Sequence, residues 1–141
     1  MINDLTKVGI IGGSGFTGEE LLRFLSNHPK TEVIAISSRT LLGQSTNQIV
    51  EGSDLIFIEP DNDIFYDCEV VFFATPHGVS MNLVNLFINK NIKVIDLSAD
   101  FRIKDIGIWE EWYNIPHSQE ELLSESVYGL TELNSSKIES A

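Results

Sequence analysis

A glycine cluster directly after a short apolar run constrains the fold of this chain more than any other feature. The run, Val8–Ile11, is typical of a buried parallel strand, and Gly13, Gly15 and Gly18 follow it at G-x-G-x-x-G spacing. In dinucleotide sites of this form, one glycine makes the tight turn, one admits a pyrophosphate and one lets the helix pack on its strand. The free N–H groups at the helix N-terminus also attract phosphate. The loop predicts a dinucleotide site formed by Gly12, Gly13, Ser14, Gly15, Phe16, Thr17 and Gly18.

The segments that follow the loop indicate an α/β fold. Leucines at helical spacing begin after Thr17 and end before Pro29, and the apolar run 33–37 completes a βαβ unit. Further apolar runs predict strands at 55–59, 70–74, 92–97 and 127–130, with a helix over 79–89. A length of 141 residues suits one domain. We therefore expect a single doubly wound (Rossmann) parallel sheet over residues 1–141, with helices on both faces.

The residues after the second strand favour a phosphorylated cofactor. In such folds an Asp or Glu at this place binds a free 2'-hydroxyl of the ribose, whereas an Arg accommodates a 2'-phosphate. Here the residues are Ser38 and Arg39, without an acid. A guanidinium binds phosphate through paired charged hydrogen bonds, so NADP(H) is favoured over NAD(H). A solvated loop arginine is the alternative interpretation.

Two later strands also end in polar residues. Ligands of open parallel sheets bind beyond the carboxyl ends of the strands, so these turns should face the crevice of the glycine loop. After the run 70–74 comes Pro76-His77-Gly78, in which His77 either touches the cofactor or ties down its own turn. After the run 92–97, Arg102 either binds an anionic substrate or pairs locally with Asp100.

Composition excludes several classes of function. A net charge of -12 argues against a nucleic-acid surface, which needs clustered Lys and Arg. No apolar run reaches the roughly 20 residues that span a membrane, and Met1–Lys7 lacks the pattern of a secretory signal. The single cysteine fits a reducing compartment, so we expect a cytoplasmic protein. We expect a raised pKa for Cys68, which lies between two carboxylates, and hence a structural thiol. No metal-site spacing is evident.

The last third of the chain is acidic and less regular. Trp109, Trp112 and Tyr113 are expected to pack a short helix against the sheet, and His117 to be a hydrogen-bonded loop residue. Residues 120–123 predict a helical turn, and residues 131–141 a polar helix with Thr131 as its N-cap.

Several stretches together resemble the N-acetyl-gamma-glutamyl-phosphate reductases of arginine biosynthesis. They occur in the family's order and cover nearly the whole chain: 12–21, 38–39, 74–80, 96–102, 112–113 and 128–132. The pair Pro-His-Gly-Val-Ser and Leu-Ser-Ala-Asp-Phe-Arg is far more specific than the glycine loop. The resemblance implies an oxidoreductase that uses NADPH and a cysteine nucleophile to reduce an acyl phosphate to an aldehyde, releasing phosphate.

The same resemblance implies roles for individual residues. The glycine loop would hold pyrophosphate, Ser38 and Arg39 the 2'-phosphate, and the turn containing Pro76, His77 and Gly78 the nicotinamide side. Arg102, with Ser98 nearby, resembles the arginine that receives the substrate phosphate in the related aspartate-semialdehyde dehydrogenases.

The chain departs from the family pattern at its end. The family's nucleophile lies in an Asn-Pro-Gly-Cys segment after a Tyr-Gly-Leu-Pro-Glu motif, and this sequence stops at Ala141 before reaching it. Thr131 also stands in place of that motif's proline. We therefore expect the cofactor domain of a longer, homo-oligomeric reductase, without the catalytic and dimerisation domain and inactive alone.

Two alternatives stay open. The chain could come from another acyl-phosphate reductase, such as an aspartate-semialdehyde dehydrogenase, or be a free-standing dinucleotide-binding module that catalyses nothing.

Overall fold

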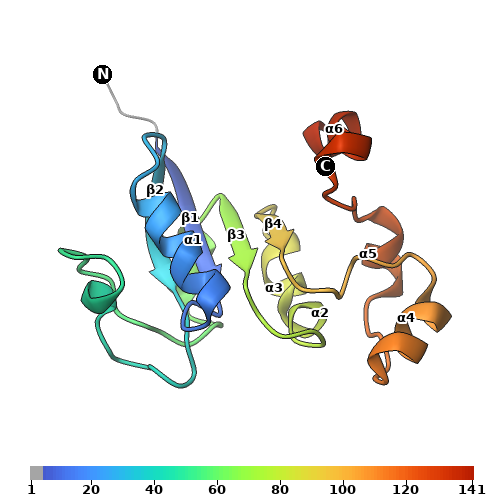
Figure 1. Cartoon of the computed structure of the whole chain (residues 1–141), viewed down its shortest axis with the longest axis horizontal. Helices are drawn as coiled ribbons and strands as arrows, with labels where there is room; N and C mark the ends of the chain where they lie inside the picture. Colours follow the sequence, from blue (N-terminus) through green and yellow to red (C-terminus); the bar gives the residue numbers. More distant parts are fainter. Residues whose placement is uncertain (1–4) are drawn as a thin grey trace.

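Four parallel strands form the sheet on which the molecule is assembled (Figure 1). The computed structural model describes residues 5–141, so Met1–Asp4 of the segment compared with a secretory signal lie outside the described residues. The strands lie side by side in the order β2-β1-β3-β4. Their bounds are β1 (Thr6–Ile11), β2 (Thr31–Ile36), β3 (Val70–Phe73) and β4 (Lys93–Asp96).

The strand order creates a switch point beside β1. The chain leaves β1, pairs β2 on one side of it, and returns to pair β3 on the other side, where Val8 faces Val70. β4 then extends the sheet, with Val70 opposite Lys93. Because all four strands are parallel, their carboxyl ends lie along one edge of the sheet. The crevice between the loops after β1 and β3 is therefore the expected ligand position.

Each face of the sheet has its own core, and side chains of β1 alternate between the two. On one face, Ile10 packs with Leu22 of α1 (Phe16–Ser26), Ile36 and Phe57. On the other face, the cluster comprises Ile11, Ala35, Phe65, Cys68, Val71, Phe73, Phe87 and Ile92. Helices thus cover both faces, with α1 in front of the sheet and α2 and α3 behind it in Figure 1. The expected doubly wound architecture is confirmed.

The helix predicted over 79–89 is divided. It forms α2 (Ser80–Leu83) and α3 (Asn85–Ile88), which meet at Val84, whose φ of -55° and ψ of -36° are helical. The structure also contains two short 3₁₀ helices, η1 (Thr46–Gln48) and η2 (Asp63–Asp67). η2 delivers Phe65 to the core, where its ring meets Phe87 edge-on at 6.1 Å.

Two predicted strands are wrong. In 55–59, Ile58 forms a single parallel bridge to Ser37 and Ile56 a single antiparallel bridge to Ser45, so neighbouring residues pair on opposite sides and no ladder continues. In 127–130, the N–H of Leu130 bonds the carbonyl of Tyr128, which uses backbone groups in a local turn instead of a sheet.

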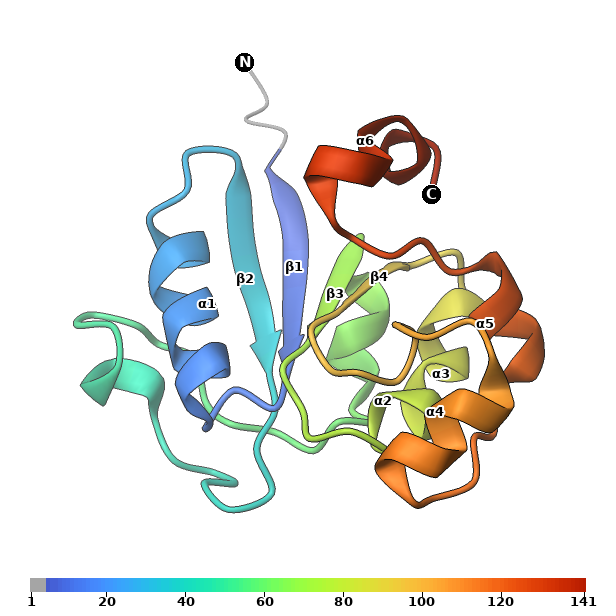
Figure 2. The same ribbon diagram turned by 45° about the vertical axis from the view of Figure 1, so that its right-hand side comes forward.

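The C-terminal third forms three more helices, α4 (Ile106–Tyr113), α5 (Glu120–Glu125) and α6 (Thr131–Glu139). In Figure 2, α6 lies near the starts of the strands, at the end of the sheet opposite the glycine loop. The N-cap prediction for Thr131 is wrong, because Thr131 is the first helical residue and Leu130, which has no capping group, holds the cap position. None of the helices in residues 5–141 is long and apolar enough to cross a membrane.

Candidate functional site

The turn after β1 depends on a glycine that precedes the three-glycine spacing. Gly12 has a φ of +88°, and a Cβ on it would lie 2.5 Å from the carbonyl oxygen of Ala74. Only glycine fits this left-handed, crowded position. Gly12 therefore makes the tight turn between β1 and the loop, and this brings the loop against the end of β3.

The three spaced glycines have different surroundings. A Cβ on Gly13 would lie 2.3 Å from Ile36, and one on Gly18 would lie 2.4 Å from the carbonyl oxygen of Gly12, so both residues permit close packing. Gly15 is exposed, and nothing lies within 4 Å of the position a Cβ would take. Gly15 therefore marks the open side of the loop, where a ligand can approach the backbone.

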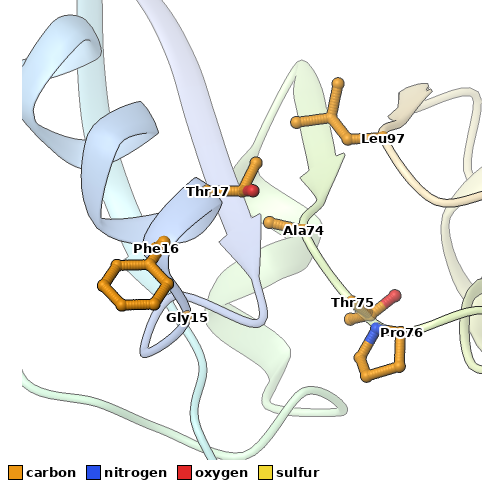
Figure 3. Close-up of a pocket in the computed structure, with 7 residues that line it drawn as sticks. All are labelled: Gly15, Phe16, Thr17, Ala74, Thr75, Pro76 and Leu97. Atoms are coloured by element: carbon orange, nitrogen blue, oxygen red, sulfur yellow. The ribbon is translucent and has the colours of Figure 1, made fainter.

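The N-terminus of α1 faces a pocket of ≈ 320 Å³ at the switch point (Figure 3). The first hydrogen bond of the helix runs from Glu19 N to Gly15 O, which leaves the preceding N–H groups without helical partners. The pocket has no acidic lining residue; it is lined by Gly15, Phe16, Thr17, Ala74, Thr75, Pro76 and Leu97. The side chain of Phe16 is 94% exposed at the start of the helix. The pocket thus combines helix N–H groups with apolar walls, as a dinucleotide requires.

Hydrogen bonds join the end of β2 to the glycine loop. Ser37 accepts the N–H of Gly12 through its hydroxyl, at 3.2 Å, and the N–H of Gly13 through its carbonyl, at 2.8 Å. The buried hydroxyl of Ser38 donates to Ser14 Oγ at 2.7 Å and lies 3.2 Å from Thr40 Oγ1. The structure therefore brings Ser14 and Ser38 together, as a shared phosphate-binding corner requires.

Arg39 directly follows Ser38 in the chain and is exposed. Within residues 5–141 the ion pairs are those of Arg23 with Glu19 and Glu20, so no carboxylate of this part of the chain neutralises Arg39. In a chain with a net charge of -12, an arginine that is not paired with a carboxylate is available to bind an anion from solution.

The turn that contains His77 is held by another residue. Asp100 is fully buried, and its carboxylate accepts the N–H of Gly78 at 2.6 Å and the N–H of Met81 at 3.0 Å. His77 is exposed and packs against Tyr113, with 5.1 Å between ring centroids and 46° between the ring planes. Asp100 thus bonds the backbone of this turn, whereas the His77 side chain contacts Tyr113. Pro76 lines the pocket, so this turn does reach the glycine loop's crevice.

The predicted alternative of an Asp100–Arg102 ion pair is wrong. The Asp100 carboxylate is buried and accepts backbone N–H groups, so it does not pair with Arg102. Arg102 is exposed, and its Nη2 donates to the hydroxyl of Tyr113 at 2.7 Å. The hydroxyl of Ser98 lies 2.9 Å from Asp96 Oδ2 and accepts the N–H of Asp100. Ser98 thus shapes the loop that carries Arg102.

A second carboxylate lies next to Asp100. Ser80 Oγ is 2.7 Å from Asp96 Oδ2 and 2.8 Å from Asp100 Oδ2, and its one hydrogen can serve only one of them at a time. The pKa of Asp96 is raised, mainly by burial; hydrogen bonds from Ser80 and Ser98 lower it, and the charge of Asp100 raises it further. Sequence reasoning missed Asp96 and Ser80. The sequence did offer one signal, because Ser80 lies in the matching segment 74–80 and Asp96 in the matching segment 96–102, which contain the two most specific motifs.

Other predicted roles are resolved by burial. His117 is buried, with Nε2 2.8 Å from the carbonyl of Asp100, so its prediction as a hydrogen-bonded loop residue is confirmed. Trp109 is fully buried and donates to Ala99 O, whereas Trp112 is 75% exposed and its predicted packing is wrong.

Burial first, and the charge of Asp67 second, raise the pKa of Cys68 to about 12. No cluster of metal-ligating side chains occurs in the described residues.

Comparisons with known proteins agree with this geometry. Residues 7–141 match the family model described as semialdehyde dehydrogenase, NAD binding domain. The chain is 50% identical to N-acetyl-gamma-glutamyl-phosphate reductase of Ruthia magnifica subsp. Calyptogena magnifica and 48% identical to that of Vesicomyosocius okutanii subsp. Calyptogena okutanii (strain HA). Each match covers 97% of this chain and 42% of the relative, so the chain spans less than half of either relative's length.

A solved structure has the same fold. The aspartate semialdehyde dehydrogenase with NADP from Candida albicans superposes with a TM-score of 0.62 and 21% identity, over 72% of this chain and 32% of that one. This likeness supports the Rossmann-like architecture.

Proposed function

Because this chain belongs to the semialdehyde dehydrogenase NAD-binding-domain family, we propose that it is the NADP(H)-binding part of an acyl-phosphate reductase. The reaction proposed for the whole enzyme converts N-acetylglutamyl 5-phosphate to N-acetylglutamate 5-semialdehyde and phosphate, as the names of its relatives suggest. A small-molecule substrate, a homo-oligomeric whole enzyme and a cytoplasmic location belong to the same proposal.

The observation that carries the proposal is the pocket at the switch point. Its residues fit a dinucleotide, because Gly15 leaves open space at the loop and α1 directs unpaired N–H groups toward it. The proposed contacts are the glycine loop with the pyrophosphate, and Arg39, Ser38 and Ser14 with the 2'-phosphate. Pro76, His77 and Gly78 would border the nicotinamide side. When bound, NADPH supplies the hydride.

The chain's own residues divide the remaining work. Arg102 would receive the substrate phosphate, on the loop that Ser98 and Asp100 shape. Cys68 is unsuited to attack an acyl phosphate, because its thiol is buried and has a pKa of about 12. We therefore propose that these residues bind and orient the cofactor and the phosphate, while the nucleophile belongs to another part of the enzyme.

Phosphate-dependent reduction of NADP⁺ tests the reaction. The coding sequence is extended to the length of the relatives, and that protein is assayed separately with N-acetylglutamate 5-semialdehyde and aspartate semialdehyde, the reverse direction of the proposed chemistry. We expect turnover with the acetylated substrate only, and only with phosphate present. Preference for aspartate semialdehyde would identify the other reductase. Tight NADPH binding without turnover of either would favour a non-catalytic module.

A further inference from the structure

Tyr113 lies between the side chains of Arg102 and His77 and contacts both. Arg102 comes from the loop after β4, His77 from the turn after β3, and Tyr113 from the last turn of α4. The phenol oxygen accepts a hydrogen bond of 2.7 Å from Arg102 Nη2, and the same ring packs at a tilt of 46° against His77, with 5.1 Å between centroids. One side chain thus contacts both groups, which come from segments 25 residues apart in the sequence.

The ring of Tyr113 is itself held in place. It stacks on the fully buried Trp109, with 4.8 Å between centroids and 34° between planes. Trp109 donates from Nε1 to Ala99 O at 2.8 Å and meets His117 edge-on. Because Ala99 lies in the loop that carries Arg102, α4 and this loop are bound into one unit. The position of the Arg102 guanidinium therefore depends on the Tyr113 hydroxyl.

The donors around Tyr113 are not saturated. Neither Arg102 nor His77 has a carboxylate partner within residues 5–141. A guanidinium has five N–H groups, and one of them is used on Tyr113. Tyr113 accepts this hydrogen bond, so the hydrogen of its own hydroxyl group is available for donation to a ligand. Arg102 and Tyr113 thus offer unused hydrogen-bond donors, and the ring of Tyr113 packs on the buried ring of Trp109.

We infer that Tyr113 is a positioning residue that holds Arg102 and His77 as a two-sided receptor for the phosphate of an acyl phosphate. The inference rests on the proposed function, which gives Arg102 an anionic ligand, and adds to it a residue that sequence reasoning assigned to packing alone. The Tyr113 hydroxyl sets the direction of the guanidinium, and the ring sets the distance to the imidazole.

The test measures phosphate affinity at the cluster in the 141-residue chain. Inorganic phosphate and acetyl phosphate are titrated at constant pH and ionic strength while the ring signals of the three histidines are followed by NMR, with His77→Gln used for assignment. Tyr113→Phe removes the hydroxyl and keeps the ring. Trp112→Phe, at an exposed neighbouring aromatic, is the matched control. NADPH affinity and thermal stability are measured for every variant.

We expect saturable shifts of the His77 signal in the unsubstituted chain and in Trp112→Phe. Phosphate binding by Tyr113→Phe should be about three- to tenfold weaker, as for loss of one hydrogen bond, with NADPH affinity and thermal stability unchanged. Equal phosphate affinity in Tyr113→Phe would overturn the inference. Absence of any saturable shift in the unsubstituted chain would overturn it too, and the NADPH titration would then show separately whether the nucleotide site exists.

Discussion

At the scale of single residues, the proposed cofactor selectivity rests on Arg39. Arg39 is exposed and follows Ser38, whose hydroxyl contacts those of Ser14 and Thr40, and no acid of the described chain pairs with Arg39. A 2'-phosphate bound at these residues would receive both a positive charge and hydroxyl donors. A 2'-hydroxyl would have no carboxylate there to accept its hydrogen.

Substitution of this arginine should separate the two cofactors. Arg39→Ala is expected to weaken NADPH binding by about 1.5 to 3 kcal/mol, the range for hydrogen bonds to charged groups, and to leave NADH affinity unchanged. Fluorescence titration with each reduced nucleotide measures this. Lys90→Ala is the control, because the Lys90 ammonium lies over the ring of Tyr66 and neither residue lines the pocket. An equal loss for both nucleotides would show that Arg39 does not read the 2'-phosphate.

The half-buried carboxylate of Asp96 should give stability a specific pH dependence. Its pKa is raised in the folded state, so between the ordinary and the raised pKa the folded chain binds more protons than the unfolded chain. The contribution of Asp96 is therefore most favourable below its ordinary pKa and is lost as the pH rises through the raised value.

Asp96→Asn should remove this pH-dependent contribution to the free energy of unfolding. The free energy of unfolding, measured in urea from pH 4 to pH 8, is expected to fall less with rising pH in the variant than in the unsubstituted chain. Asp61→Asn, at an exposed position, should keep the original profile. Superimposable profiles for Asp96→Asn and the unsubstituted chain would contradict the assignment.

At the scale of elements, β1, its loop and α1 form the unit that we propose to bind phosphate. The sequence predicted this unit well, because an apolar run, a glycine cluster and a leucine face are all local signals. It did not single out Gly12 as the tight-turn residue, since the crowding there comes from Ala74, more than 60 positions away. It also failed at 55–59 and 127–130, where an apolar run has no continuous partner strand.

Two glycines of this unit should respond to substitution in opposite ways. Gly15→Ala enters open space at an allowed φ of -87°, so we expect a stability change within about 1 kcal/mol, because a poorer N-cap offsets a stiffer unfolded chain. NADPH affinity should fall, since the new methyl group occupies the approach of the pyrophosphate.

Gly18→Ala brings a Cβ to 2.4 Å from the backbone oxygen of Gly12. We expect it to lower the free energy of unfolding by about 1 to 3 kcal/mol, the usual range for overpacking. Chemical denaturation of both variants, together with NADPH titration, measures the contrast. A greater loss of stability in Gly15→Ala than in Gly18→Ala would contradict these roles.

At the scale of the whole molecule, the candidate site is one edge of the sheet. The loops after β1, β2, β3 and β4 carry the glycine turn, Arg39, His77 and Arg102 respectively, and parallel strands bring all of them to the same side (Figure 2). Periodicity and strand order could predict that arrangement. They could not predict Asp100 as the link between two loops, or Tyr113 between Arg102 and His77, because both depend on contacts between distant elements.

The affinities of the 141-residue chain for NADPH and NADH, measured side by side, test the nucleotide assignment most directly. The pocket, the N–H groups of α1 and the Arg39 corner together predict that NADPH binds at least about tenfold more tightly than NADH, as one charged hydrogen bond requires. Equal affinities, or binding of neither nucleotide, would contradict it.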